Sequence, residues 1–486
     1  MNKSETKKNI SKNYIYNLFY QLLLIVIPLI TTPYISRVIG AEGIGVYSYT
    51  LSIVSYFTIF AAFGTTVYAQ REIAYCQDDI EKRSKIFLEV FFLRFILSVI
   101  ALIIYFCVIL HSQDIHVFFI QSLYIIGIIT DVSWYFQGME EFGKIFLANS
   151  AAKILNLICI FLFVNDTNDL IKYILLLALF PVVGNIILLY TIKNSITKVP
   201  LKELNPFLHI GGAFQLFIPA VATQIYTVFD KTMIGLYTDT SIQNGFYEQA
   251  MGIIRLCMTI VTSLVTVMVP KISYAFAKGD IEGIKCYMNK SFRFTWAMGL
   301  PITVGLAMVA ELFVPWYMGD GFDEVIILIR LGCILVLFVG FSNVIGVQYL
   351  GPVKKQIITT TTVIIGSCIN LCMNLVLIPG YFAIGAVIAS VIAEGSITMC
   401  QLVYLIYMRK DFKWKDILGG VWKYVISVII MAILLMAFRQ LMSPTILFTF
   451  LYVGLGGLIY LSILYILKDS LLLDMLHRMT NIRKHK

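Results

Sequence analysis

The chain has 486 residues, of which 59% are hydrophobic and 13% are charged, with a net charge of +9 and a mean hydropathy of +0.85. Soluble globular proteins are about 45–50% apolar and about 25% charged, so this composition excludes a soluble enzyme and a disordered or nucleic-acid-binding chain. The positive charge must therefore be interpreted by its position relative to a membrane.

About fourteen apolar stretches follow one another along the chain, each near the roughly 20 residues that cross a bilayer as a helix. Their apolar runs are continuous rather than alternating, which favours helices over the strands of a closed barrel. We therefore predict an all-α polytopic membrane protein with about 14 transmembrane helices. The predicted spans are 13–36, 45–69, 86–110, 115–137, 145–164, 170–192, 209–235, 246–270, 288–312, 323–346, 355–377, 381–408, 418–439 and 445–467.

Basic residues alternate in abundance between successive loops. If the N-terminus is cytoplasmic, the inner segments carry basic clusters such as 82–85 and 409–415, whereas the outer segments carry Arg37, Lys172 and Arg439. The positive-inside rule then places both the N- and the C-terminus in the cytoplasm. The N-terminus is polar and lysine-rich, and we expect no cleavable signal peptide.

The two halves of the sequence resemble each other. The segment TVYAQREIAYCQDDIE at 66–81 aligns with TVMVPKISYAFAKGDIE at 266–282, and this alignment pairs Asp79 with Asp280. Parallel repeats related by an axis along the membrane normal are a known plan of transporters that use alternating access. We predict an N-terminal lobe at 1–205 (helices 1–6), a C-terminal lobe at 206–410 (helices 7–12), and two additional helices with a basic cytoplasmic tail at 411–486.

Several charged residues fall within or close to the predicted spans, where a central charge costs about 2.5–3.5 kcal/mol. Basic residues predominate, which indicates a cationic cavity for an anionic ligand. The opposing interpretation is snorkelling to the interface or internal pairing, for example of Arg94 with Glu89 or of Asp230 with Lys231. The cationic candidates are Arg37, Arg94, Lys231, Arg255 and Arg293, and the possible ion-coupling or pairing carboxylates are Asp131, Asp230, Glu248 and Glu394.

Prolines also fall inside the predicted helices. Pro28 and Pro219 occupy comparable places in helices 1 and 7, where each removes a backbone hydrogen bond. Either they are hinges that bend during a transport cycle, or they are static kinks that aid packing.

Motifs of the common enzymes and motors are absent. The sequence has no Gly-x-x-x-x-Gly-Lys-Ser/Thr loop, no Gly-x-Ser-x-Gly, no His-Glu-x-x-His and no metal-ligand spacing among its histidines and cysteines. We therefore expect no ATPase motor, no enzyme activity, no metal and no cofactor.

A set of motifs in a fixed order resembles a known family. These are PYISRVIGAEGIGVYSY (33–49), YAQREIA (68–74), WYFQGMEEF (134–142), IPAVATQIYTVFDKTMIGLY (218–237), GFYEQAMGI (245–253) and SNVIGVQYLGPVKK (342–355). With them the chain resembles the bacterial polysaccharide flippases of the multidrug/oligosaccharidyl-lipid/polysaccharide exporter superfamily.

The resemblance implies a multi-pass protein of the bacterial cytoplasmic (plasma) membrane that translocates undecaprenyl-diphosphate-linked oligosaccharide repeat units to the outer leaflet for capsule, exopolysaccharide or O-antigen synthesis. A polysaccharide polymerase and a chain-length regulator are the implied protein partners, beside the lipid bilayer. A diphosphate is polyanionic, and this agrees with the excess of basic residues. Within the motifs, the positions carried over are Arg37, Asp230, Lys231 and Glu248.

Three other functions stay open. The first is an ion-coupled exporter of drugs or small metabolites, although cationic drugs would favour carboxylates. The second is a flippase for the lipid-linked peptidoglycan precursor. The third is a membrane-embedded glycan polymerase or ligase, which the short predicted outer loops disfavour.

Overall fold

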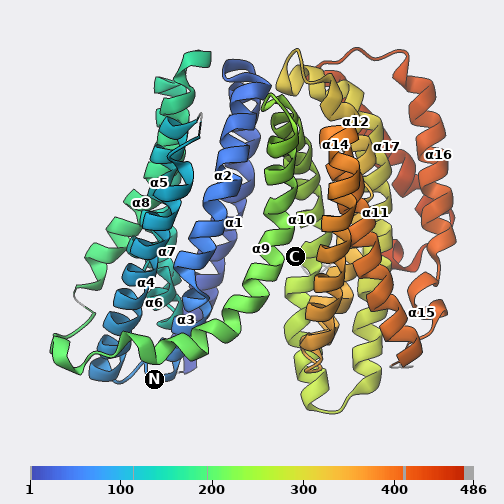
Figure 1. Ribbon diagram of the computed structural model, residues 1–486. Coiled ribbons are helices and arrows are strands. Elements are labelled where there is room, and N and C mark those ends of the chain that lie inside the picture. Colours follow the sequence, from blue (N-terminus) through green and yellow to red (C-terminus); the bar gives the residue numbers. More distant parts are fainter. Residues whose placement is uncertain (1–2, 113, 194, 409–411, 475–486) are drawn as a thin grey trace. The chain divides into compact units, whose positions relative to one another are not determined.

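The computed structural model describes residues 3–112, 114–193, 195–408 and 412–474 (Figure 1). The side chains of residues 3–18, 219–220, 222–223 and 225–227 lie outside this description. The regular structure in the described ranges is helical, which confirms the predicted fold class. The chain divides into two compact units, Met1–Gly245 and Phe246–Lys486, and each is described separately below.

Unit 1 contains nine α-helices and three short 3-10 turns in its described residues. The helices are α1 (Lys3–Val38), α2 (Gly40–Ala62), α3 (Thr65–Tyr75), α4 (Ile80–Ile109), α5 (Ile115–Thr130), α6 (Ser133–Gly138), α7 (Phe142–Phe163), α8 (Leu170–Ile192) and α9 (Ile210–Tyr237). The 3-10 turns are η1 (Thr167–Asp169), η2 (Leu201–Glu203) and η3 (Pro206–His209).

Unit 2 holds the remaining helices. They are α10 (Ile242–Ala277), which begins just before the division, α11 (Ile281–Met318), α12 (Asp323–Gly332), α13 (Leu335–Asn343), the π-helix η4 (Val344–Leu350), α14 (Gln356–Val403), the π-helix η5 (Tyr404–Met408), α15 (Trp414–Leu418), α16 (Val421–Arg439) and α17 (Ile446–Ile466).

The predicted spans correspond to these helices. Twelve described segments are long and apolar enough to cross a membrane. One of them, Gln356–Met408, has 53 residues and contains the non-helical Phe382, so it holds two of the predicted spans. α9 holds the span predicted at 209–235. The described helices thus accommodate about fourteen crossings, as hydropathy predicts.

Some crossings are interrupted in ways that the hydropathy pattern does not reveal. Phe63 (φ 45°) and Gly64 (φ 70°) are left-handed residues that separate α2 from α3. Asp131 is extended (φ −72°, ψ 109°) and separates α5 from α6. Such breaks expose backbone groups inside a membrane protein, where they need partners within the protein. The break at Asp131 has such partners, as described below.

Buried apolar side chains form the core of unit 1. One cluster surrounds Trp134, which is fully buried and stacks on Phe87 with ring centroids 5.4 Å apart. A second cluster surrounds Tyr105, whose hydroxyl donates to the carbonyl of Phe118 at 2.7 Å. These contacts join α4 to α5 and α6, and they hold the α5–α6 break in place.

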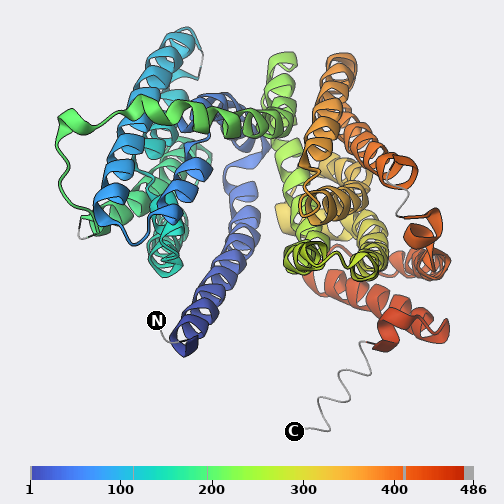
Figure 2. The ribbon, with the colours of Figure 1, turned by 90° about the horizontal axis from the view of Figure 1, so that it is seen from below.

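The first part of α9 crosses the end of unit 1 before the helix turns along α2 (Figures 1 and 2). α9 approaches the neighbouring backbone and side chains closely near both of its ends. A Cβ on Gly64 would lie 2.4 Å from the carbonyl oxygen of Ala213, and one on Gly235 would lie 2.1 Å from the ring of Tyr49. One helical turn before Gly235, the hydroxyl of Thr232 is 2.9 Å from those of both Ser52 and Tyr56.

In unit 2, the two helices that follow the predicted repeat pack on α11. α16 and α17 contact each other and both contact α11. The core of this unit lies between α11, α13, η4 and α14, around Phe292, Phe341 and Tyr349.

One feature of the internal repeat has a structural counterpart. Asp79 precedes α4 and accepts from the backbone N–H of Lys82 at 3.0 Å, while Asp280 precedes α11 and accepts from that of Gly283 at 2.8 Å. The two residues that the alignment pairs are therefore N-caps of corresponding helices. The lobe boundaries at 205–206 and 410–411 stay a prediction.

Candidate functional site

Arg94 is buried in α4 and binds the break between α5 and α6. Its Nη1 donates to the carbonyl oxygen of Asp131 at 2.9 Å, and its Nη2 lies 3.2 Å from Oδ2 of the same residue. The arginine is 1% exposed, whereas the Asp131 side chain is 21% exposed. The remaining Asp131 oxygen, Oδ1, accepts from the N–H of Ser133 at 3.0 Å. This pair stabilises the break, and its arginine is enclosed in the structure described.

The pairing predicted between Arg94 and Glu89 is wrong. Residues five apart on a helix point in different directions, and Glu89 contacts the segment before α9 instead. Its Oε2 lies 2.9 Å from Nε2 of His209, and its Oε1 accepts from the N–H of Asn205 at 2.9 Å.

Asp230 and Lys231 lie next to each other on the part of α9 that packs on α2. Asp230 is 2% exposed, and Lys231 is half-buried. Thr232, the following residue, forms the hydroxyl contacts with Ser52 and Tyr56. The pair is therefore fixed to α2 by its neighbour.

Arg255 and Glu248 form an ion pair on α10. Arg255 Nη2 is 3.2 Å from Glu248 Oε1, and Arg255 Nε donates to the carbonyl of Met251 at 3.1 Å. The side chains are 48% and 29% exposed. A spacing of seven residues places both on one helix face, so two residues predicted for different roles neutralise each other in this structure.

The remaining predicted charges lie on three different helices, α1, α11 and α14. Arg37 is exposed at the end of α1 and donates from Nη1 to the carbonyl of Pro33 at 2.8 Å. Arg293 is exposed on α11 and donates to the Ser470 hydroxyl at 2.9 Å. Glu394 is half-buried in the second part of α14.

The two predicted hinge prolines differ in what the structure describes. Pro28 is exposed inside α1, which stays helical on both sides of it. The side chain of Pro219 is outside the described residues. A hinge at either position stays a prediction.

A charged cluster in unit 2 was not predicted as a site. Glu311 on α11 bonds Arg330 on α12 through Oε1 and lies 3.3 Å from Arg439 of α16 through Oε2. Arg439 also donates to the carbonyl of Met442 at 2.9 Å. One carboxylate thus serves two arginines, which leaves a net positive charge and ties α16 to α11.

An apolar cavity of about 300 Å³ lies near this cluster, between α10, α11, α16 and α17. The hydroxyls of Tyr452 and Tyr460 donate to the carbonyls of Leu435 and Ala297, so the two rings contribute apolar surface to the lining. Hydropathy alone could not locate this cavity, because every spanning helix has apolar faces. Other lining residues are Cys257, Leu306 and Met431.

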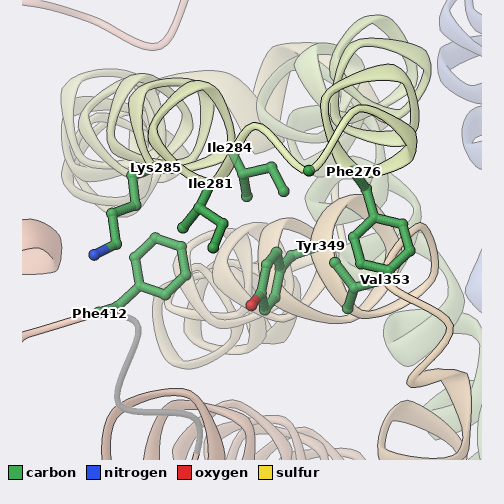
Figure 3. A pocket seen from close by; sticks show the side chains of 8 residues that line it. Phe276, Ile281, Ile284, Lys285, Tyr349, Val353 and Phe412 are labelled. Atoms are coloured by element: carbon green, nitrogen blue, oxygen red, sulfur yellow. The ribbon is translucent and has the colours of Figure 1, made fainter.

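A second pocket, of about 240 Å³, lies at the turn between α10 and α11 (Figure 3). The rings of Phe276, Tyr349 and Phe412 surround it, and the Lys285 ammonium lies at its edge. The described residues contain no group of three or more His, Cys, Asp or Glu side chains that could hold a metal ion. The lining of this pocket is thus aromatic and aliphatic, and Lys285 is its charged side chain.

Comparisons with known proteins agree with this architecture. A family model described as polysaccharide biosynthesis protein matches residues 10–276, more than half of the chain. A candidate O-antigen transporter of Escherichia coli (strain K12) is 24% identical over 406 residues, which are 82% of this chain and 97% of that protein. Its counterpart from Shigella dysenteriae is 21% identical over 380 residues, 77% of this chain and 94% of the relative.

Solved structures share the fold. The lipid II flippase MurJ in an inward closed conformation superposes with a TM-score of 0.74 at 18% identity, covering 94% of this chain and 99% of MurJ. An inward-facing multidrug resistance MATE family transporter of the MOP superfamily gives a TM-score of 0.60 at 13% identity, covering 79% of this chain and 97% of the transporter. The motifs, the helical fold and the family match agree, and the chain belongs to the polysaccharide biosynthesis protein family.

Proposed function

We propose that the chain translocates undecaprenyl-diphosphate-linked oligosaccharide repeat units from the inner to the outer leaflet of the bacterial cytoplasmic membrane, for capsule, exopolysaccharide or O-antigen synthesis. The family and fold are those of flippases and transporters. We infer that the chain has no enzyme activity of its own, and that a polymerase and a chain-length regulator act on its product.

The observation that carries this proposal is the partly exposed Arg255–Glu248 pair inside a spanning helix. An arginine at membrane depth is costly and is usually functional. Because guanidinium groups bind phosphate through two parallel hydrogen bonds, a diphosphate can replace Glu248 as the partner of Arg255. The released carboxylate is then available to bind a proton or cation, so the pair can exchange an anionic substrate for a coupling ion.

Other basic residues support an anionic substrate. Lys231 is half-buried, and Arg37 and Arg293 are exposed. Arg94 has a structural role in this proposal, because it is enclosed and bound to Asp131. We assign Lys231 and Arg255 to the diphosphate and leave Arg37 and Arg293 as secondary contacts.

The apolar cavity of unit 2 supports a lipid as the carrier of the sugar. Its lining is almost entirely hydrocarbon, and a branched polyprenyl chain is of the same chemistry. The cluster of Glu311, Arg330 and Arg439 lies close by, since Arg439 is one helical turn beyond the lining residue Leu435. An apolar cavity beside a net positive charge matches a lipid with an anionic head.

Flipping by purified protein tests the proposal. Proteoliposomes would carry a fluorescent undecaprenyl-diphosphate oligosaccharide, and an impermeant enzyme that cleaves the sugar would report the outward-facing fraction. We expect the wild type to equilibrate the lipid between leaflets faster than empty liposomes. No acceleration would contradict the proposal. Acceleration of only the lipid-linked peptidoglycan precursor would favour that alternative, and drug efflux without lipid movement would favour an exporter.

A further inference from the structure

Three polar side chains form a buried chain of contacts at the start of α9. The Tyr68 hydroxyl is 2.9 Å from Nδ1 of His209, and His209 Nε2 is 2.9 Å from Oε2 of Glu89. The other Glu89 oxygen accepts from the N–H of Asn205 at 2.9 Å. Glu89 is 2% and His209 5% exposed. The function proposed above uses neither residue.

These contacts attach α9 to the rest of unit 1. Tyr68 lies on α3 and Glu89 on α4, while Asn205 and His209 belong to the segment that leads into α9. The ring of Tyr68 also packs on Gly212, where a Cβ would come within 2.3 Å of it. Releasing His209 from Glu89 would therefore free the first turn of α9 from α4.

His209 can take up one proton while its contacts with Tyr68 and Glu89 both stay hydrogen bonds. With neutral His209, Nε2–H donates to the Glu89 carboxylate and Nδ1 accepts from Tyr68. With charged His209, both ring nitrogens donate, so Nδ1–H donates to the Tyr68 oxygen and the Tyr68 hydroxyl hydrogen rotates away from the ring. Buried opposite charges then compensate each other.

A second proton, on Glu89, removes the favourable contact between Glu89 and the charged His209. A proton on Glu89 Oε2 places a donor against the Nε2–H donor and leaves the imidazolium buried without its counter-charge. The contact must then open so that the imidazolium reaches water.

Other charged groups around the pair are already engaged or exposed. On α3, Glu72 and Arg71 face Tyr68 and lie 3.4 Å from each other. On α4, Arg83 donates to the carbonyls of Gln77 and Ser195. On η2, Lys202 and Glu203 are exposed.

We propose that Glu89 and His209 form a proton-binding site whose protonation releases the start of α9 from α4. α9 also carries Lys231, so a movement at its start reaches a residue assigned to the substrate. This link to transport rests on the function proposed above, whereas the proton-dependent release does not.

One variant of the pair should respond to pH and the other should not. In Glu89→Gln the counter-charge is gone, so protonation of His209 alone opens the contact. In His209→Gln no buried cation can form, and the amide still bonds the neutral acid, so the contact stays closed. The wild type, which needs both protons, opens at a lower pH than Glu89→Gln.

Spin labels on the full-length chain in lipid nanodiscs measure this opening. The labels go on Lys82→Cys at the start of α4 and Gly211→Cys at the start of α9, with the native cysteines replaced. Lys82 is exposed, and a Cβ on Gly211 meets no atom within 4 Å. Distance distributions are recorded from about pH 4 to about pH 8. Glu141→Gln, which removes an exposed ion pair with Lys144, is the matched control.

We expect Glu89→Gln to change from a short to a longer distance as the pH falls, and His209→Gln to keep the short distance throughout. Glu141→Gln should follow the wild type. Distances in Glu89→Gln that do not depend on pH, or that change equally when His209→Gln is added, would overturn the proposal. If lipid flipping fails while these distances behave as expected, the proposed function is wrong and the proton site stands.

Discussion

Arg94 contacts both the backbone carbonyl and the carboxylate of Asp131, at 2.9 and 3.2 Å, and this double contact bridges α4 to the break between α5 and α6. The same Asp131 carbonyl accepts from Trp134 Nε1 at 3.0 Å. A single residue outside regular helix thus connects a buried cation to the aromatic core of unit 1.

Arg94→Ala should destabilise the protein. Removing one partner of a buried pair costs about 3–5 kcal/mol, and the partial exposure of Asp131 favours the lower end. The expected result is a lower melting temperature in detergent and a lower abundance in membranes. Arg94→Ala with Asp131→Asn should recover part of the loss, since no unpaired carboxylate remains. If Arg94→Ala keeps full stability and loses only transport, Arg94 belongs to the substrate site instead.

Two glycines of α9 test how closely this helix packs on its neighbours: Gly235 lies at a close contact, and Gly211, which does not, is the control. Gly235→Ala would place a Cβ 2.1 Å from the Tyr49 ring, and the displacement should cost about 1–3 kcal/mol. Gly211→Ala meets open space, and its better helix propensity should stabilise by up to about 1 kcal/mol. Thermal unfolding of both variants checks this. Equal melting temperatures would mean that the close approach of α9 to Tyr49 is absent in the membrane.

Lys231→Ala and Arg255→Ala should each reduce surface polysaccharide without lowering membrane abundance. Each removes a positive charge assigned to the diphosphate, and neither empties a packed core. Lys144→Ala, which breaks an exposed pair with Glu141, is the control and should export normally. Complementation of a deletion strain, with immunoblots for abundance, is the measurement. Full export by both variants would refute the cationic assignment and leave the fold intact.

Glu248→Gln tests the exchange of partners at Arg255. Because the pair is partly exposed, its loss should cost no more than about 1 kcal/mol of stability. Without a competing carboxylate the diphosphate should bind more tightly and leave more slowly, which lowers KM and kcat together. An unchanged KM in the liposome assay would argue that Glu248 does not compete with the substrate.

Burial raises the pKa of the Cys76 thiol, which lies in the turn between α3 and α4 outside the spans. A raised pKa keeps the thiol protonated to higher pH, so alkylation by maleimide should be slow near neutral pH and accelerate only in the alkaline range. A variant that keeps Cys76 alone, compared with one that keeps the exposed Cys286, gives the measurement. Equal rates at neutral pH would show that the turn opens readily.

The sequence predicted the spans well because hydropathy over about 20 residues depends on burial in lipid and not on tertiary contacts. It also paired Asp79 with Asp280, and both residues cap helices. The interruption at Phe63 was not predicted, because a left-handed phenylalanine leaves no compositional signal, whereas the one at Phe382 lies next to the predicted boundary between the spans 355–377 and 381–408.

The partners of buried charges were harder to predict. Arg94 was matched with the nearest carboxylate in sequence, but the fold brings Asp131 to it from 37 residues away. Glu89 and His209 are 120 residues apart, and no spacing rule connects them. Arg255 and Glu248, by contrast, lie seven residues apart on one helix, and their contact could have been predicted from that spacing.

The most direct test of the central claim is a clean deletion of the gene in its host, with surface polysaccharide and undecaprenyl-diphosphate-linked sugars assayed together. If the chain is the flippase, the deletion strain loses its polysaccharide and traps repeat units on the inner leaflet, and the intact gene restores both. Lost polymer with single repeat units already on the outer face would contradict it and indicate a role in polymerisation. Normal polysaccharide with altered drug tolerance would contradict it in favour of an exporter.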